Sequence, residues 1–430
     1  MTVVVLCFGR SKWRWSPSQR RSRILTSVNP STEIAPDLAA HIATAVAVLC
    51  ALMTLAGLVY MVLTLRAGRS FTHYWRTHPL TALATAPTVT LLKPLKGVDA
   101  RMYAGLRSHC LQQYAGRYEI LFGVSSLEDP AVAEIDRLRA EFPELAMRVI
   151  ECPERLGTSG KVSNLAQMLP HALGEILLVN DSDILVSPHY LARVVAGFTS
   201  RSNKRVGMVT TPYLGASAKG HGLLSRIEAL GIATEFFPSV LTARMLEGGL
   251  RFGLGSTLAM PREVLEQIGG FAPLAEHLAD DYELGARIYR AGYAVELVPE
   301  IVETTVPRYT LRGFCDHQLR WMRSVRDSRR AGYLGVAVTY VIAWALATCV
   351  ASGFELWSFT LLSIAVLARV AVALSIGVGI LRDEQVLRDI WLLPLRDCVG
   401  LLLWAWSYAG DTVVWRGERF HLRRGILHRS

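Results

Sequence analysis

The sequence predicts an α/β fold with a mostly parallel sheet, flanked by membrane-spanning helices at both ends. Between residues 87 and 330, short β-branched runs alternate with amphipathic stretches of helical length, which is typical of a parallel sheet covered by helices on both faces. Long apolar runs precede and follow this region. Charged residues make up only 19% of the 430 residues and hydrophobic residues 51%, a balance that favours membrane segments over a purely soluble chain.

The predicted strands are short apolar runs, and helical periods lie between them. The strands are expected at residues 88–92, 119–124, 147–152, 175–180, 207–211 and 293–298. Helices are expected at residues 131–142, 262–268 and 282–290, among others. In such sheets ligands bind beyond the carboxyl ends of the strands, so these ends are where chemistry is sought.

The amino-terminal part divides into a basic extension and an anchor. Residues 1–38 contain Ser, Pro and basic residues without a helical period, and we expect them to be disordered. Residues 39–65 are apolar with no full charge and exceed the roughly 20 residues that a bilayer requires. This run lacks a cleavage pattern of small residues and is therefore expected to be a transmembrane anchor.

The carboxy-terminal part, residues 332–415, reads as a membrane region followed by a basic tail at 416–430. Residues 332–352 and 357–381 are two apolar spans. A third run, residues 390–415, is interrupted by Arg396, Asp397 and Asp411. Because charges at the bilayer centre are costly, we expect part of this run to be interfacial or re-entrant.

The formal net charge is +10, and the basic residues gather beside the apolar runs instead of forming one patch. Basic clusters that flank spans are expected at a membrane face with anionic lipid. This distribution argues against a nucleic-acid partner and predicts a multi-pass integral membrane protein with its α/β domain on the cytoplasmic face. The seven cysteines show no CxxC spacing, which argues against a disulfide framework or a zinc site.

The strongest local motif is Asp181-Ser182-Asp183, directly after the apolar strand at 175–180. Its position places both carboxylates at the carboxyl edge of the sheet. Carboxylates and phosphate oxygens together hold Mg²⁺ or Mn²⁺, and such an ion would neutralise the charge on a departing diphosphate. The alternative is a simple Asp/Ser turn after a strand.

A second acidic pair, Asp280-Asp281, opens the helix predicted at 282–290. These residues suit an N-terminal helix cap. A catalytic interpretation makes Asp281 a general base that removes the proton of an attacking hydroxyl group. In a single displacement we expect the two acidic motifs to have separate roles, one carboxylate binding the metal and another accepting the proton of the hydroxyl group.

Two further motifs favour binding of anions and sugars. His317-Gln-Leu-Arg320-Trp321 offers a guanidinium for a diphosphate and a flat apolar face for a sugar or acyl chain, although Arg and Trp are also common at membrane interfaces. Gly157-Thr-Ser-Gly160-Lys161 precedes a helix and favours an anion at the helix start. Its spacing differs from the P-loop, which argues against ATP.

Taken together these motifs resemble the ceramide glucosyltransferase family, glycosyltransferase family 21, whose lipid-modifying members have a GT-A domain. The resemblance covers roughly residues 39–425 and includes bacterial relatives that glycosylate hopanoids. Its segments are 91–99 (LLKPLKGVD), 161–165 (KVSNL), 180–184 (NDSDI), 253–257 (GLGST), 279–282 (ADDY), 320–321 (RW) and 415–419 (WRGER).

The resemblance implies a role for individual residues. It implies that Asp181 and Asp183 bind the divalent cation and the UDP moiety, and that Asp281, beside Asp280, is the base. It places Lys161 and Asn164 near the nucleotide. The remaining substrate-binding positions that it implies are Lys93, His317, Arg320 and Trp321. It also implies that the apolar stretch 223–246 lies at the membrane surface near the acceptor.

The sequence departs from the family pattern at two positions. Ser126 stands where the first acidic motif has Asp, and Glu128 and Asp129, close behind, are candidates to supply the missing carboxylate. Ser126 and Glu128 are therefore also expected to bind substrate. His317 replaces the usual Gln or Arg of the (Gln/Arg)xxRW motif. Both departures concern recognition of the nucleotide more than the chemistry at Asp281.

The resemblance implies an inverting transfer of glucose or N-acetylglucosamine from a UDP-sugar to a lipid hydroxyl, of ceramide or of a hopanoid polyol. One alternative is a processive polysaccharide synthase on the same core, which typically has more spans and an intact QxxRW motif. Another is an inactive membrane scaffold, suggested by Ser126 and opposed by the two remaining acidic motifs.

Overall fold

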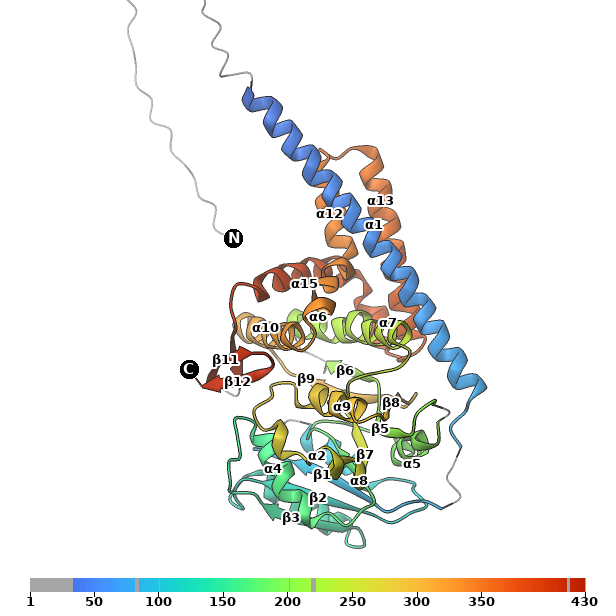
Figure 1. Ribbon diagram of the computed structural model, residues 1–430, viewed down its shortest axis with the longest axis vertical. Coiled ribbons are helices and arrows are strands. Elements are labelled where there is room, and N and C mark those ends of the chain that lie inside the picture. Colours follow the sequence, from blue (N-terminus) through green and yellow to red (C-terminus); the bar gives the residue numbers. More distant parts are fainter. Residues whose placement is uncertain are drawn as a thin grey trace, which may run out of the picture.

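The computed structural model describes residues 34–81, 85–99, 101–200, 202–217, 222–415 and 418–429. Nearly all of the extension predicted at residues 1–38 lies outside these ranges. Figure 1 shows a sheet domain at one end, a layer of helices across it, and a bundle that includes the long helix α1 (Ile34–Thr77) at the other end.

Seven strands form the central sheet, in the order β3-β2-β1-β4-β7-β5-β8. Neighbours pair in parallel except at β7, which is antiparallel to both β4 and β5. The strands are β1 (Val89–Pro94), β2 (Tyr118–Val124), β3 (Ala146–Glu151), β4 (Ile176–Val179), β5 (Val206–Thr210), β7 (Leu258–Pro261) and β8 (Ala294–Leu297). The predicted α/β class with a mostly parallel sheet is confirmed.

Helices cover both faces of this sheet because its buried strands alternate their side chains between two cores. On β1, Leu91 packs in one hydrophobic cluster and Leu92 in the other. The first cluster includes side chains of α2 (Met102–Cys110), α3 (Ala131–Glu141) and α5 (Tyr190–Ala196). The second includes side chains of α4 (Gly160–Met168), α8 (Arg262–Gln267) and α9 (Asp280–Arg290).

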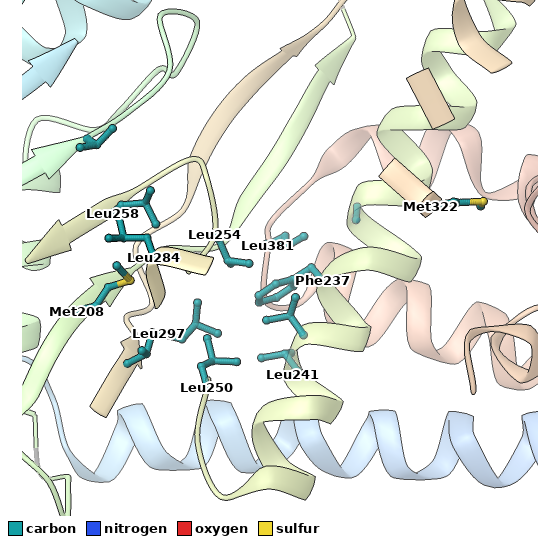
Figure 2. Close-up of a cluster of buried hydrophobic side chains, with 14 of the residues drawn as sticks. Met208, Phe237, Leu241, Leu250, Leu254, Leu258, Leu284, Leu297, Met322 and Leu381 are labelled. Carbon is teal, nitrogen blue, oxygen red and sulfur yellow. The ribbon is translucent and has the colours of Figure 1, made fainter. Parts of the chain in front are cut away.

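A layer of helices separates the sheet from the apolar bundle (Figure 1). It contains α6 (Leu223–Gly231), a π-helical segment (Ile232–Phe236), α7 (Phe237–Glu247), α10 (Leu311–Ser328) and α15 (Leu393–Ser407). In Figure 2, Phe237 and Leu241 of α7 lie near Leu250 and Leu254, with Leu258 and Leu297 beyond them, all within one buried core. The stretch 223–246, expected at the membrane surface, is therefore largely packed against the protein.

The apolar bundle contains the candidate membrane spans. Leu38–Thr77 and Leu356–Val378 are each long and apolar enough to cross a membrane, and the second includes α13 (Leu356–Val372). A third candidate consists of Arg330–Thr339 and Val341–Ala351, two segments with a bend of 61° between them. Apolar helices thus lie near both ends of the chain, as the sequence predicts.

The third carboxy-terminal run does not form a candidate span. It follows α14 (Glu384–Asp389) and contains a 3-10 turn (Ile390–Leu392), α15 and the strand β10 (Thr412–Trp415). The charges that interrupt it are satisfied within the protein: Asp397 Oδ1 lies 3.1 Å from Arg369 Nε, and Arg396 Nη2 lies 2.9 Å from Glu235 Oε2. The interruption therefore lies in a helix that packs on α10.

Five strands escaped prediction besides β7. Strands β6 (Tyr213–Ser217) and β9 (Val302–Val306) form a small parallel pair. The segment expected as a basic tail instead forms β11 (Glu418–Arg423) and β12 (Ile426–Arg429), which complete a three-stranded sheet with β10. On β11 the alternation of buried Phe420 and Leu422 with exposed residues produces one apolar face.

Candidate active site

The Asp181-Ser182-Asp183 loop leaves β4 at the carboxyl edge of the sheet and is held from two sides. Asp183 Oδ2 accepts hydrogen bonds from Thr304 Oγ1 at 2.7 Å and from Thr305 N at 2.8 Å, both on β9. On the other side Gly105 of α2 touches the loop, because a Cβ there would lie 2.9 Å from the carbonyl oxygen of Ser182. These contacts hold the loop in a defined position.

Lys161 joins the two acidic motifs. Its Nζ atom, at the start of α4, lies 2.7 Å from Asp181 Oδ1 and 3.6 Å from Asp280 Oδ2. Burial by itself would lower the pKa of Lys161. The charges of the nearby aspartates raise it by more than burial lowers it, so the pKa lies above its ordinary value. Carboxylates almost 100 residues apart therefore meet at one protonated ammonium group.

Asp281 lies at the start of α9, beside the Gly253–Thr257 segment. Its Oδ1 accepts a hydrogen bond from Tyr282 N at 2.8 Å. A Cβ on Gly255 would lie 2.9 Å from Asp281 Oδ2, so a side chain at this position would displace the carboxylate. Burial, and then the charge of Asp280, raise the pKa of Asp281 to about 6. A carboxylate with such a pKa is suited to accept a proton near neutral pH.

The carboxylates of this site are suited to bind a divalent cation. Burial first, and then the charge of a neighbouring carboxylate, raise the pKa of Asp183 and of Asp281, which indicates a concentration of negative charge. Within the described ranges no three His, Cys, Asp or Glu side chains form a complete metal cage. Magnesium commonly binds through one or two carboxylates and completes its shell with phosphate oxygens and water, so Asp181 and Asp183 fit such an ion.

A cavity of about 520 Å³ adjoins this acidic centre at the carboxyl ends of β1, β2 and β3. Lys161 belongs to its lining and connects it to Asp181 and Asp280. Three other residues predicted to bind substrate also line the cavity: Ser126, Glu128 and Asn164. Asp129 lines it too, but its carboxylate accepts hydrogen bonds from the backbone N–H groups of Gly97 and Ala131.

Lys93 lies beneath the centre instead of lining the cavity. It is completely buried, with Nζ 3.1 Å from His109 Nε2 and 3.4 Å from the carbonyl oxygen of Asp181. Burial lowers its pKa to about 7. The contact with the backbone of the loop indicates that Lys93 supports Asp181, whereas the sequence predicted a direct contact with substrate.

His317, Arg320 and Trp321 lie together on α10. Arg320 Nη2 lies 3.2 Å from His317 Nδ1, and the rings of His317 and Trp321 are 5.1 Å apart. His317 Nε2 lies 3.3 Å from Oε1 of Glu228, a buried residue of α6. The same carboxylate accepts hydrogen bonds from Tyr309 Oη and Gln318 Nε2, each at 3.1 Å.

Tyr213 on β6 belongs to a row of aromatic rings that reaches this cluster. Burial raises its pKa, and so do the charges of Asp281 and Glu228. Its ring is 5.3 Å from Phe236, which is in turn 6.3 Å from Trp321. A row of aromatic rings therefore leads from Tyr213 on β6 to Trp321 on α10, which precedes the bent apolar helices.

Sequence reasoning missed several residues of this site. Glu228 had a visible signal, since it and Arg226 are the two charged residues of a mostly apolar helix. Thr304 had none, because its role depends on the pairing of β9 beside the Asp183 loop. The same holds for Glu276, which accepts a hydrogen bond from Thr158 Oγ1, and for Glu418, which lines the cavity from the carboxy-terminal sheet.

Comparison with known proteins agrees with these motifs. The family model described as Glycosyl transferase family 21 matches residues 49–427, nearly all of the described chain. The chain belongs to glycosyl transferase family 21. The predicted resemblance is thus confirmed, and the mostly parallel sheet agrees with the GT-A domain that it implied.

Relatives of this family 21 chain include ceramide glucosyltransferases. Ceramide glucosyltransferase 3 of Caenorhabditis elegans is 25% identical over 255 residues, 59% of this chain and 54% of the relative. Ceramide glucosyltransferase of Candida albicans is 29% identical over 126 residues, 27% of this chain and 23% of the relative. The chain thus spans about half the length of the nematode relative.

Solved structures resemble the family 21 chain more distantly. A mannosyltransferase from Pyrobaculum calidifontis, in complex with GDP-Man and Mn²⁺, covers 83% of this chain and 98% of its own, with 19% identity and a TM-score of 0.49. Glucosyl-3-phosphoglycerate synthase from Mycobacterium tuberculosis, with Mn²⁺ and UDP, covers 61% and 78%, with 17% identity and a TM-score of 0.31. The fold assignment rests on the order of the strands in the sheet.

Proposed function

We propose that the protein is an inverting glycosyltransferase that moves one sugar, glucose or N-acetylglucosamine, from a UDP-sugar to the hydroxyl group of a membrane lipid. Ceramide and hopanoid polyols are the acceptors that we favour. The observation that carries the proposal is the bridge at Lys161, which brings Asp181 and Asp280 to one ammonium group. A donor-binding loop and a candidate base thereby share one site, close to apolar helices.

Asp281 acts as the general base in this mechanism. It accepts the proton of the lipid hydroxyl as the oxygen attacks the anomeric carbon. The new bond from carbon to acceptor oxygen forms while the bond from carbon to diphosphate oxygen breaks, and the configuration inverts because the two oxygens lie on opposite faces. Transfer therefore requires a hydroxyl group beside Asp281 and a diphosphate beside Lys161.

The remaining residues bind and orient the substrates. Asp181 and Asp183 would hold the divalent cation, which when bound supplies positive charge to the departing diphosphate. Lys161 adds a second positive charge near the same oxygens. His317, Arg320 and Trp321 lie toward the apolar helices, where a sugar ring or lipid headgroup would pack on the indole. An α/β domain on the cytoplasmic face would meet UDP-sugars there.

The test is transfer by the purified full chain in detergent or nanodiscs, with UDP-glucose or UDP-N-acetylglucosamine and with ceramide or a hopanoid polyol. Mass spectrometry should detect a single hexose or N-acetylhexosamine on one lipid. Asp281→Asn should still bind the UDP-sugar while turnover is lost. A ladder of products would indicate the polysaccharide synthase, and no transfer with any of these pairs would contradict the proposal.

A further inference from the structure

The carboxy-terminal sheet β10–β12 closes one side of the cavity described above. Glu418 and Phe420 of β11 belong to the lining, opposite the loops that follow β1, β2 and β3. These two residues lie more than 250 residues beyond Lys161 in the chain. The cavity therefore has one wall from the α/β domain and another from the end of the polypeptide.

Backbone hydrogen bonds hold this sheet beside the acidic helix α9. Leu278 N donates to the carbonyl oxygen of Gly425 at 3.1 Å, and Leu427 N donates to that of Glu276 at 2.9 Å. The Glu276 side chain in turn bonds to Thr158 at the cavity rim. The sheet is thus attached to the loop that leads into Asp280 and to the loop that precedes Lys161.

Packing and α10 hold the sheet from the other side. Phe420 and Leu422 form a small buried cluster with Leu278. Arg326 Nη1, on the helix that carries Trp321, donates to the carbonyl oxygen of Gly410 at 3.0 Å, just before β10. The wall is therefore a packed element in a defined position, and its contribution to the cavity is part of the fold.

Alternation along β11 directs Glu418 to the cavity. Glu418 and Phe420 share one face of the strand, since side chains two residues apart point the same way. Phe420 is buried in the cluster, whereas Glu418 lies beyond it and is exposed at the lining. A carboxylate accepts hydrogen bonds but repels phosphate, so its ligand is an uncharged part of the donor that carries hydroxyl or N–H groups.

We propose that β10–β12 is the outer wall of the donor cavity and that Glu418 recognises the nucleoside half of the donor, by accepting hydrogen bonds from its ribose hydroxyl or base N–H groups. The inference rests on the nucleotide-sugar donor of the proposed function. The diphosphate lies toward Lys161, and the nucleoside extends through the cavity to β11. Glu418 is thereby a binding residue that no acidic motif of the α/β domain contains.

The experiment compares the binding of UDP and of inorganic diphosphate to the full chain in detergent, by calorimetry, for wild type and Glu418→Ala. The variant should bind UDP roughly tenfold more weakly, the loss expected for one hydrogen bond to a charged group. Its affinity for inorganic diphosphate should stay unchanged. Glu144→Ala, at an exposed glutamate outside the cavity, is the matched control and should match wild type.

Two outcomes would overturn the inference. One is an unchanged affinity of Glu418→Ala for UDP, and the other is an equal loss for UDP and diphosphate, which would indicate a general effect on the site. Equal melting temperatures of variant and wild type would exclude misfolding at this exposed position. The assay contains no acceptor, so failure of lipid glycosylation by wild type would contradict the proposed function while a selective UDP defect would still support the role of Glu418.

Discussion

Thr304 donates its hydroxyl to Asp183 Oδ2 over 2.7 Å, although 121 residues separate the two in the chain. Thr305 adds its backbone N–H to the same oxygen at 2.8 Å. These two donors orient a carboxylate that we propose to be a cation ligand. Hydrogen-bond partners of this kind hold a metal ligand in its binding geometry. Their loss therefore lowers the affinity for the ion more than it lowers the stability of the fold.

Thr304→Val should therefore raise the concentration of Mn²⁺ or Mg²⁺ needed for half-maximal transfer. One lost hydrogen bond of about 0.5–1.5 kcal/mol corresponds to a roughly two- to tenfold change. Thr305→Val is the matched control, because Thr305 donates through its backbone and its own Oγ1 has no hydrogen-bond partner among the described residues. Equal metal requirements for the two variants would refute the orienting role.

The raised pKa of Asp281 predicts an acid limb in the pH profile of transfer. A general base must be deprotonated, so kcat/KM should fall about tenfold per pH unit below the pKa of about 6. Asp280→Asn should shift this limb to lower pH, because the charge of Asp280 raises the pKa of Asp281. Lys161→Met should shift it to higher pH, since Lys161 lowers that pKa.

Because the two variants should shift the acid limb in opposite directions, they test the assignment of Asp281 as the general base even if their transfer rates are low. The readout is the midpoint of the profile, which is independent of the absolute rate. Residual activity of Asp281→Asn should show no limb near this pH. A midpoint that stays in place in Asp280→Asn would mean that another group titrates.

Glu228 should influence the acceptor and not the donor. Its carboxylate accepts hydrogen bonds from Tyr309 Oη and Gln318 Nε2 and lies beside His317. It therefore orients the side of α10 that carries Trp321. In Glu228→Gln one of these donors would meet an amide N–H group. We expect the KM for the lipid to rise at least several-fold, with an unchanged KM for the UDP-sugar.

A structural defect alone would affect both substrates, so the split between the two KM values is the informative measurement. Glu263→Gln offers a control, because Glu263 pairs with Arg205 at an exposed position remote from the cavity lining. A parallel rise of both KM values in Glu228→Gln would contradict a role on the acceptor side.

Local sequence patterns predicted six of the seven strands of the central sheet, because a strand's apolar and β-branched residues lie next to one another in the chain. The run 119–124 is apolar and β-branched, and it appears as β2 within one residue of its expected start. The reversal of β7 could not be foreseen, since strand direction depends on long connections. The catalytic interpretation placed the carboxylates of the two acidic motifs in one site, but the bridge at Lys161 is visible only in three dimensions.

The partners of buried charged residues could not be predicted from the sequence either. Arg396 and Asp397 were recognised as costly in a membrane segment, and the run that contains them is not among the candidate spans of the described residues. Their partners lie on other elements, Glu235 on the π-helical segment and Arg369 on α13. Pairing across 28 residues and across more than 150 residues cannot be deduced from the pattern of one helix.

The buried pair Arg369–Asp397 yields a prediction about stability. Both side chains are almost fully buried, at 2% and 0% exposed, and their atoms lie 3.1 Å apart. Arg369→Met leaves the Asp397 carboxylate buried without its ion-pair partner, which should lower the free energy of unfolding by about 3–5 kcal/mol. Asp397→Leu should cost a similar amount. Thermal unfolding of the full chain in detergent measures both effects.

The double variant Arg369→Met/Asp397→Leu separates a buried charge from lost packing. With neither charge present the desolvation cost disappears, so the double variant should be more stable than either single variant. Some loss will persist, because Arg369 Nη1 also donates to the carbonyl oxygen of Thr234 at 2.6 Å. Arg205→Met, at the exposed pair with Glu263, should change stability by less than about 1 kcal/mol. Additive losses in the double variant would show that the pair does not act as a charge-compensated unit between α13 and α15.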